Sequence, residues 1–475
     1  MNQDTQVLSE HFIGGQWVSA QGQAQVPLVR PSTGQSLGRA NLGNAEDAHA
    51  AVRAAGAAAA AMAATTREQR QGFLANILHA YQARSGELAR VIEDELGAPR
   101  ALCEQLHVPV GLMQLQKWGA LLQDFAFTEA RGQHQVRHQP VGVCVLISSW
   151  NYPVNGPMGV LLPAIVAGCP MVWKPSEYAL RSGRILAEIF AQAGLPEGAF
   201  NMVMGGAEVG EALVTAREVA MVSFTGSAKV GQHVAQRAAA SFKRTVLELG
   251  GKSPFVVLPG APTAQAVQAC AQGLFMNSGQ SCNAPSRLLV PRADLDAAKA
   301  VAKAAAESVV IGPPDQAGVQ MGPIGHAQHD RALQDFLEAG VREGNELVAG
   351  GPGRPAGLER GYYARPTVFV ASAQAQVSQH EAFGPVMTII PYDSVEDAIA
   401  IANDSEFGLS AYVIGPAAEE VAPRIQAGMV HVNGATMDLG MPFGGVKQSG
   451  IGRKFGPEGL SAYLEVQTVL LPAAQ

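Results

Sequence analysis

The stretch Val141-Gly-Val-Cys-Val-Leu-Ile-Ser-Ser149 decides the fold of this chain. It is a short, continuously apolar run, which is typical of a strand buried in a parallel sheet. Similar runs follow at 171–174, 201–204, 219–224 and 245–249, and helical patterns fill the intervals between them. Strands that alternate with helices build a doubly wound sheet. We therefore predict an α/β fold for this part of the chain.

A second alternating unit begins at 255–258 and includes strands at 287–290 and 411–414. It predicts a second α/β domain, and the boundary falls near Gly250-Gly251. We expect residues 1–122 and 141–249 to form a dinucleotide-binding domain and residues 250–458 a catalytic domain. Chemistry is then expected in the cleft between the two domains.

Two segments fit neither domain. Residues 123–140 contain a polar, alternating stretch that predicts an exposed hairpin, and residues 459–475 contain a terminal apolar strand. Exposed strands with apolar faces pair readily with another subunit. We expect these segments to form a small β oligomerisation element.

The composition excludes several classes of protein. The 475 residues are 47% hydrophobic and 15% charged, as in a compact enzyme, and the net charge of −7 does not attract nucleic acid or anionic lipid. No signal peptide or membrane-spanning run is apparent. Five scattered cysteines without a CxxC pair favour a reducing cytoplasm over a disulfide framework. His326 and His329 lack a third ligand, so we expect no metal site.

The eleven residues Asn277-Ser-Gly-Gln-Ser-Cys282-Asn-Ala-Pro-Ser-Arg287 place a cysteine on a tight polar turn. Cys282 lies 34 residues beyond Glu248, in Leu247-Glu-Leu-Gly-Gly-Lys-Ser-Pro254. A thiolate can attack a carbonyl, and a carboxylate can then activate water against the thioester. A buried structural thiol is the alternative for Cys282. The cysteines in apolar or helical settings are interpreted as structural: Cys103, Cys144, Cys169 and Cys270.

A dinucleotide site is indicated although the GxGxxG pattern is missing. The strand at 219–224 runs into Thr225-Gly226-Ser227, a glycine turn that opens a helix and lets a pyrophosphate approach the backbone. Alone, this turn is equally an ordinary βα connection. Lys174 and Glu177 follow another strand, where they suit a ribose with two free hydroxyls. Because Glu177 would repel a 2′-phosphate, NAD is favoured over NADP, with a surface salt bridge as the alternative.

These segments together resemble the signatures of the NAD(P)-dependent aldehyde dehydrogenase superfamily, in its hydrolytic branch. Three further segments carry the resemblance: Ser149-Trp-Asn-Tyr-Pro153, Glu381-Ala-Phe-Gly-Pro-Val386 and Pro442-Phe-Gly-Gly-Val-Lys-Gln-Ser-Gly450. The resemblance covers nearly the whole chain. It implies a Rossmann-type cofactor domain, a second α/β catalytic domain and a β element that joins subunits into a homodimer or homotetramer. It also implies oxidation of an aldehyde to the carboxylic acid with NAD, NADP being possible.

The resemblance also assigns roles. Cys282 would form a thiohemiacetal and then a thioester, Asn151 and the Cys282 N–H would stabilise the alkoxide, and Glu248 would activate water. Lys174 completes the catalytic set. From the residues alone, Asn151 is equally a turn residue and Glu248 a paired structural acid. Between two leucines, Glu248 should have a raised pKa, as suits a base near neutrality.

The remaining expected site residues fall into two groups. The cofactor would contact Ile147, Ser148, Trp150, Lys174, Glu177, Gly206, Gly210, Phe224, Gly226, Ser227, Val230, Leu249, Glu381 and Phe383. The aldehyde tunnel would be lined by Met113, Tyr152, Gly159, Ser281, Asn283 and Phe443. Gly159 replaces a bulky side chain of many relatives, so we expect a wide tunnel. A solvated loop acid and a core aromatic are the alternatives for Glu381 and Phe383.

One position departs from the family pattern. Lys454 stands after Gly452-Arg453, where the family usually has Glu. The reversed charge is expected to affect the water relay of deacylation or to favour an acidic substrate. The alternative is a surface substitution without functional effect. A CoA-acylating relative is a second function hypothesis, which the presence of Glu248 disfavours. A non-redox cysteine hydrolase or a silent binding protein is a third.

Overall fold

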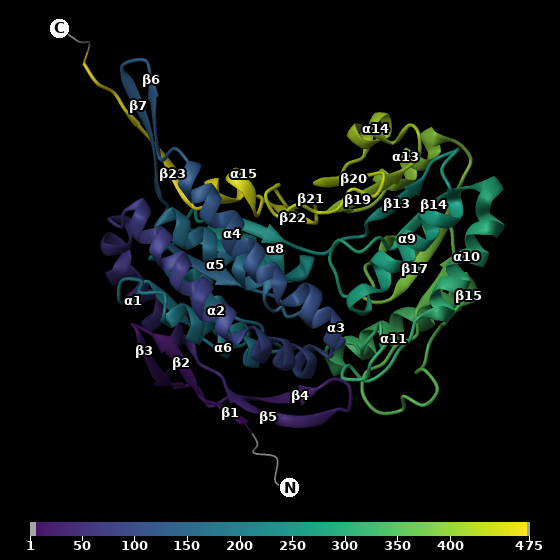
Figure 1. Ribbon diagram of the computed structural model, residues 1–475, viewed down its shortest axis with the longest axis horizontal. Coiled ribbons are helices and arrows are strands. Elements are labelled where there is room, and N and C mark those ends of the chain that lie inside the picture. The colour runs from purple at the N-terminus through teal and green to yellow at the C-terminus, as the bar shows by residue number, and fades with distance from the viewer. Residues whose placement is uncertain (1–5, 473–475) are drawn as a thin grey trace.

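The computed structural model describes residues 6–472, which form two lobes and a projecting arm (Figure 1). The strands of the first lobe are β2 (Glu10–Ile13), β3 (Gln16–Ser19), β8 (Val143–Ile147), β9 (Met171–Lys174), β10 (Phe200–Met202), β11 (Val219–Thr225), β12 (Arg244–Glu248) and β22 (Gly450–Ile451). They form one sheet in the order β22-β12-β11-β8-β9-β10-β2-β3. The five central strands are parallel, and β22 and β2 are antiparallel to their neighbours. The predicted apolar runs are confirmed as the parallel core of this sheet.

Helices cover both faces of the first sheet. They are α1 (Ala45–Ala63), α2 (Arg67–Leu96), α4 (Pro109–Asp124), α5 (Asn155–Ala167), α6 (Leu180–Ala191), α7 (Ala207–Thr215) and α8 (Ala228–Ala239). Cys144 and Leu146 of β8 pack into one hydrophobic cluster with α2, α4, α5 and α6. Val143 and Val145 pack into the other with α1, α7 and α8. Alternate residues of a strand point to opposite faces, so the sheet is doubly wound as predicted.

The second lobe contains the second predicted α/β unit. Its strands are β13 (Pro254–Val257), β14 (Arg287–Pro291), β15 (Glu346–Ala349), β16 (Thr367–Val370), β17 (Val386–Tyr392), β19 (Ser410–Ile414) and β20 (Met429–Val432). They pair in the order β15-β16-β17-β14-β13-β19-β20, and only the β15–β16 pair is antiparallel within the described sheet. The longer helices around it are α9 (Thr263–Phe275), α10 (Leu295–Ser308), α11 (Ala327–Arg342) and α13 (Val395–Asn403).

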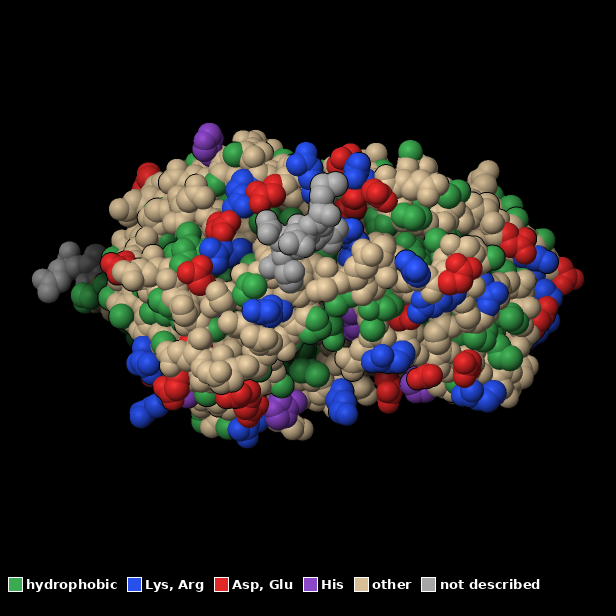
Figure 2. Space-filling model, turned by 90° about the horizontal axis from the view of Figure 1, so that it is seen from below, with side chains coloured by type: hydrophobic (Ala, Val, Ile, Leu, Met, Phe, Trp, Pro, Cys, Tyr) green, Lys and Arg blue, Asp and Glu red, His purple; other side chains and the backbone are tan. Residues whose placement is uncertain are grey.

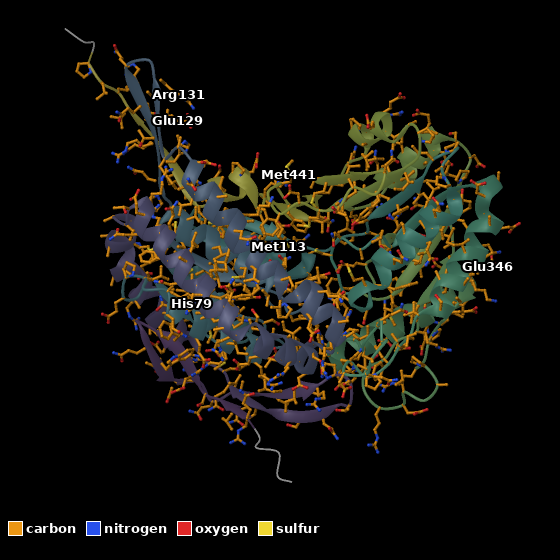
Figure 3. All side chains as sticks on the ribbon, viewed as in Figure 1. His79, Met113, Glu129, Arg131, Glu346 and Met441 are labelled. Atoms are coloured by element: carbon orange, nitrogen blue, oxygen red, sulfur yellow. The ribbon has the colours of Figure 1, made fainter. Side chains whose placement is uncertain are left out.

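Three strands form the arm that projects from the first lobe in Figure 1: β6 (Thr128–Arg131), β7 (His134–Pro140) and β23 (Leu464–Val469). They pair as β23-β7-β6, so the predicted hairpin and the predicted terminal strand are confirmed and lie side by side. Glu129 and Arg131, labelled in Figure 3, form an ion pair at 3.2 Å on this hairpin. Val466 remains 62% exposed. The arm therefore presents an open apolar position.

Short elements complete the chain. A sheet of β1 (Gln6–Leu8), β5 (Gln35–Asn41) and β4 (Gln25–Arg30) lies across the bottom of Figure 1, and β18 (Phe407–Gly408) pairs with β21 (Val446–Lys447). Figure 2, which views the molecule from that side, shows acidic and basic side chains interspersed. Within residues 6–472, no helix is long and apolar enough to cross a membrane.

The chemistry is expected at the segment between the two lobes. β12 ends at Glu248, and β13 begins at Pro254. β22 returns from the late part of the chain to pair with β12, and places Gly450 opposite Glu248. Late residues therefore close the edge of the early sheet at this carboxylate. The division into domains at residues 122, 141, 249 and 458 stays a prediction.

Candidate active site

A strained turn presents Cys282. Asn277, Ser278 and Gly279 all have left-handed backbone conformations, with φ of 52°, 58° and 72°. A Cβ on Gly279 would lie 2.2 Å from the carbonyl carbon of Gly384, so only glycine fits there. Three successive left-handed residues persist only where the surroundings enforce them, and such strain is concentrated at functional sites.

Buried amides fix this turn against the first lobe. The Asn277 side chain contacts the His107 ring at 3.3 Å and donates to the carbonyl of Asn151 at 3.0 Å. The Asn151 side-chain amide donates in turn to the carbonyl of Gln280, also at 3.0 Å. An amide nitrogen has two N–H donors, so Asn151 retains one for another acceptor. The structure thus places the Asn151 side chain against Gln280, two residues before Cys282.

Two glycines make room for the groups around Cys282. A Cβ on Gly251 would meet the Cys282 carbonyl oxygen at 2.3 Å, and one on Gly250 would meet the Glu381 carboxylate at 2.2 Å. Glu381 accepts a hydrogen bond from the Gly251 N–H at 3.0 Å. Gly250 and Gly251 therefore allow the Glu381 carboxylate and the Cys282 backbone to approach closely. Both glycines belong to the sequence motif, but these contacts join residues far apart in the chain.

Burial shapes the electrostatics of the site. It raises the pKa of the Glu248 carboxyl to about 8, against the opposing charges of Lys454 and Arg453. It raises the pKa of Glu381 to about 7 and that of the Cys282 thiol to about 12, the thiol being raised further by the Glu381 and Glu248 carboxylates. Glu248 is only 3% exposed, and within residues 6–472 neither of its carboxylate oxygens has a hydrogen-bond partner. An unpartnered carboxylate with a pKa near neutrality suits a general base.

A cavity of about 690 Å³ lies at the carboxyl ends of the parallel strands, where doubly wound sheets bind nucleotides. It is lined by most of the residues expected to hold the cofactor: Ile147, Ser148, Trp150, Lys174, Glu177, Gly206, Gly210, Phe224, Gly226 and Val230. Three residues that the sequence did not predict also line the cavity: Glu208, Glu211 and His233. The packing of α7 against α8 brings them there.

The cavity fits a dinucleotide. Lys174 and Glu177 face each other at 3.3 Å in its wall, as two hydrogen-bonding groups for a ribose would. A Cβ on Gly226 would lie 2.5 Å from the Phe224 ring. Because Gly226 has no side chain, the backbone at the start of α8 stays accessible. An anion is stabilised at such a helix N-terminus. The volume falls in the range of cofactor sites.

The other four expected cofactor residues lie outside the lining of this cavity. Ser227 caps α8 and accepts from the Val230 N–H at 3.4 Å, and Leu249 packs against Gly231. Glu381 lies beside Cys282, as described above. Phe383 has a left-handed φ of 49°, and its ring lies 5.8 Å from Trp150. His329 contacts the Phe383 carbonyl at 2.7 Å, so the HxxH pair belongs to this aromatic packing.

The expected substrate residues are placed unevenly. The Tyr152 and Ser281 hydroxyls are 2.6 Å apart beside Cys282, and the Asn283 carbonyl accepts from Tyr412 at 2.9 Å. Met113 is 44% exposed on α4, and Figure 3 shows it below Met441. Phe443 is half-buried, 6.1 Å from Phe455.

Gly159 lies against the ring of Phe455, and the wide tunnel stays a prediction. A Cβ at Gly159 would lie 3.0 Å from the Phe455 ring, so this ring already occupies the space beside the glycine. Lys454, next to Phe455, is 8% exposed, and so the surface-substitution alternative is wrong. The sequence alone could not show that Phe455 lies beside Gly159 or that Lys454 is buried, because both come from a turn late in the chain.

The comparisons with known proteins agree with this geometry. Residues 17–469 match the sequence model of the aldehyde dehydrogenase family. A 3-succinoylsemialdehyde-pyridine dehydrogenase of a Pseudomonas species is 42% identical, over 97% of this chain and 98% of its own length.

Solved structures agree as well. A mutant of aldehyde dehydrogenase C from Pseudomonas syringae, complexed with NAD+ and octanal, superimposes with a TM-score of 0.97 at 38% identity, and the match covers all of both chains. The Mycobacterium tuberculosis aldehyde dehydrogenase complexed with NAD+ gives 0.96 at 34% identity, over 99% of this chain and 100% of that one. The chain with this cysteine, this carboxylate and this cavity belongs to the aldehyde dehydrogenase family.

Proposed function

We propose that this enzyme oxidises an aldehyde to the carboxylic acid with NAD, through a thioester on Cys282 that Glu248 hydrolyses with water. The observation that carries the proposal is the meeting of three groups beside a dinucleotide-sized cavity: a thiol, an amide with a free N–H, and an unpartnered carboxylate. The NAD complexes of two similar aldehyde dehydrogenases support the choice of cofactor.

In the first step the Cys282 thiol gives its proton to a water molecule, and the sulfur bonds to the aldehyde carbon. The carbonyl electrons move onto oxygen, which becomes an alkoxide in a buried site. The free N–H of Asn151 and the backbone N–H of Cys282 stabilise this charge as fixed donors. Tyr152 and Ser281, hydrogen-bonded to each other, form one wall for the aldehyde.

Residues of the cavity would hold NAD, its pyrophosphate at the start of α8 and a ribose at Lys174 and Glu177. The remaining cofactor residues would contribute at the nicotinamide end, where Glu381 and Phe383 lie next to Cys282 and Trp150. When bound, NAD accepts the hydride that the thiohemiacetal carbon releases. The product on the enzyme is the Cys282 thioester.

Hydrolysis of the thioester returns the enzyme to its starting state. Glu248 removes a proton from water, the water oxygen bonds to the acyl carbon, and the Cys282 sulfur leaves as a thiolate. The carboxylic acid then departs. The catalytic roles of Cys282, Glu248, Asn151 and Lys174 belong to this proposal.

Asn151→Ala is expected to lower kcat/KM about 100- to 1000-fold, because the alkoxide loses a preorganised donor. Steady-state rates of NADH formation measure the effect. NAD affinity, from a calorimetric titration, should remain as in the parent enzyme. A loss below tenfold would contradict the role of Asn151.

Glu177→Gln is expected to raise the preference for NADP relative to NAD about tenfold. The carboxylate repels a 2′-phosphate, and the neutral amide keeps the shape of the side chain. The ratio of kcat/KM values with the two cofactors provides the measurement. An unchanged ratio would show that Glu177 does not face the 2′ position.

The main alternative is a CoA-acylating reaction, in which a thiol replaces water. Product analysis for free acid against acyl-CoA distinguishes the two reactions. An initial-rate screen of aliphatic, aromatic and semialdehyde substrates then defines the substrate class.

We also propose a homodimer or homotetramer that forms through the arm, because the exposed Val466 would be covered by a second subunit. A cytoplasmic location is part of the same proposal and rests on the five free cysteines. Sedimentation of the intact chain against a variant with Val466→Lys tests the interface.

A further inference from the structure

Lys454 is a buried cation that the mechanism above does not use. Its backbone pairs with Phe443, N–H to carbonyl in both directions, at 2.7 and 2.8 Å. Its ammonium donates to the Thr225 hydroxyl at 2.7 Å. Burying an ammonium costs free energy unless an opposite charge compensates it. A single neutral hydroxyl does not, so a nearby anion is needed.

Glu248 is the anion in the right place. Thr225, which holds the ammonium, lies opposite Glu248 in the register of β11 and β12. Both strands end at this point, and both carboxylate oxygens of Glu248 are buried without a hydrogen-bond partner among the residues 6–472. The buried cation and the unpartnered carboxylate thus lie on neighbouring strand ends.

The other charged groups around Glu248 are already engaged elsewhere. Arg453 donates to the carbonyls of Gly445 and Gly452, and Glu381 accepts from the Gly251 N–H and faces Lys252. Cys282 is the remaining titratable group that faces both Glu248 and Lys454. Lys454 is therefore the buried cation that faces both reacting groups.

We propose that Lys454 is a positioning residue for hydrolysis: its ammonium, anchored on Thr225, is the counter-charge that lets Glu248 ionise at a lower pH and holds it for the acyl-thioester. The inference rests on the proposed function, in which Glu248 is the base. Thr225, which anchors the ammonium, lines the cofactor cavity and lies opposite Glu248 in the sheet. This anchoring favours a role in hydrolysis over recognition of an acidic aldehyde.

Burial lowers the pKa of Lys454, and the charges of Glu248 and Cys282 oppose that fall. The charge of Lys454 lowers the pKa of Glu248, against the rise that burial causes, and it lowers the pKa of the Cys282 thiol in the same way. Removal of the cation should therefore raise the pH above which Glu248 acts as a base. An opposite charge at such range shifts a carboxyl pKa by about one unit or more.

The test uses 4-nitrophenyl acetate and the enzyme without NAD. The Cys282 sulfur bonds to the acetyl carbon, the bond to 4-nitrophenolate breaks, and water then displaces the sulfur to give acetate. The burst of nitrophenolate reports acylation, and the steady state reports hydrolysis. In Lys454→Met we expect the midpoint of the steady-state pH profile to rise by about one unit, with hydrolysis about tenfold slower at pH 7 and parental rates above the new midpoint.

Lys454→Arg, which keeps the charge, should stay within about threefold of the parent at pH 7. Lys303→Met is the matched control, because it removes the same charge from an exposed position on α10. Its profile should coincide with that of the parent. Thermal unfolding identifies a variant that fails to fold, in which case Lys454→Gln replaces Lys454→Met in the comparison.

A steady-state profile of Lys454→Met that coincides with the parental one would overturn the proposal. A uniform fall at every pH would also overturn it, because that is the result of a merely structural role. Glu248→Gln, run in the same assay, distinguishes a failure of the role of Lys454 from a failure of the proposed function. If Glu248→Gln hydrolyses the acyl-enzyme at the parental rate, the proposed function itself fails in its choice of base.

Discussion

Cys282→Ala is expected to abolish aldehyde oxidation, with a loss of at least about 10⁴-fold in kcat. Every covalent step of the proposed reaction passes through this sulfur, and the neighbouring Ser281 hydroxyl is hydrogen-bonded to Tyr152. The other four cysteines are fully buried, whereas Cys282 is partly exposed. NADH formation with an excess of aldehyde measures the loss.

The controls separate chemistry from folding. Cys282→Ala should bind NAD with the parental affinity, because the thiol does not line the cavity that we propose for the ribose and the pyrophosphate. Cys103→Ala removes a buried thiol that hydrogen-bonds to the Ala98 carbonyl, far from the proposed nucleophile in the chain, and should retain full activity. Appreciable turnover by Cys282→Ala would refute the thioester route.

Glu248→Gln is expected to give a rapid burst of about one NADH per active site, followed by a steady state about 100- to 10,000-fold slower than in the parent. The amide cannot remove a proton from water, so the acyl-enzyme accumulates. Stopped-flow absorbance of NADH measures the burst and the steady state in one experiment. Mass spectrometry of the quenched enzyme should detect the acyl group on Cys282.

The parent enzyme should carry the pH signature of this base. Because burial raises the pKa of Glu248 to about 8, hydrolysis should accelerate as the pH rises through 8 and slow as the carboxyl gains its proton below it. Glu346→Gln, at an exposed ion pair on the far edge of the second lobe (Figure 3), should leave both burst and steady state unchanged. A parental steady-state rate in Glu248→Gln would exclude this residue as the base.

The chain's alternating apolar runs determined its architecture. Five runs from Val143 to Glu248 form parallel strands within two residues of the predicted bounds, because each run has both faces to bury and must be covered by helices. The sequence also predicted the polar hairpin and the terminal strand, and both form. The order of the motifs also led to the expectation that Cys282, Glu248 and the cofactor turn share one site.

What only the tertiary structure decided lies in contacts between distant segments. Phe455 fills the space beside Gly159, Gly251 admits the Cys282 carbonyl, and Lys454 meets Thr225 across 229 residues. A linear pattern reports what each residue prefers by itself, whereas a pocket is formed by side chains that arrive from separate elements. The sequence therefore determined the strands and the reactive residues of this protein, and packing between the two lobes determined the shape and the charge of the site.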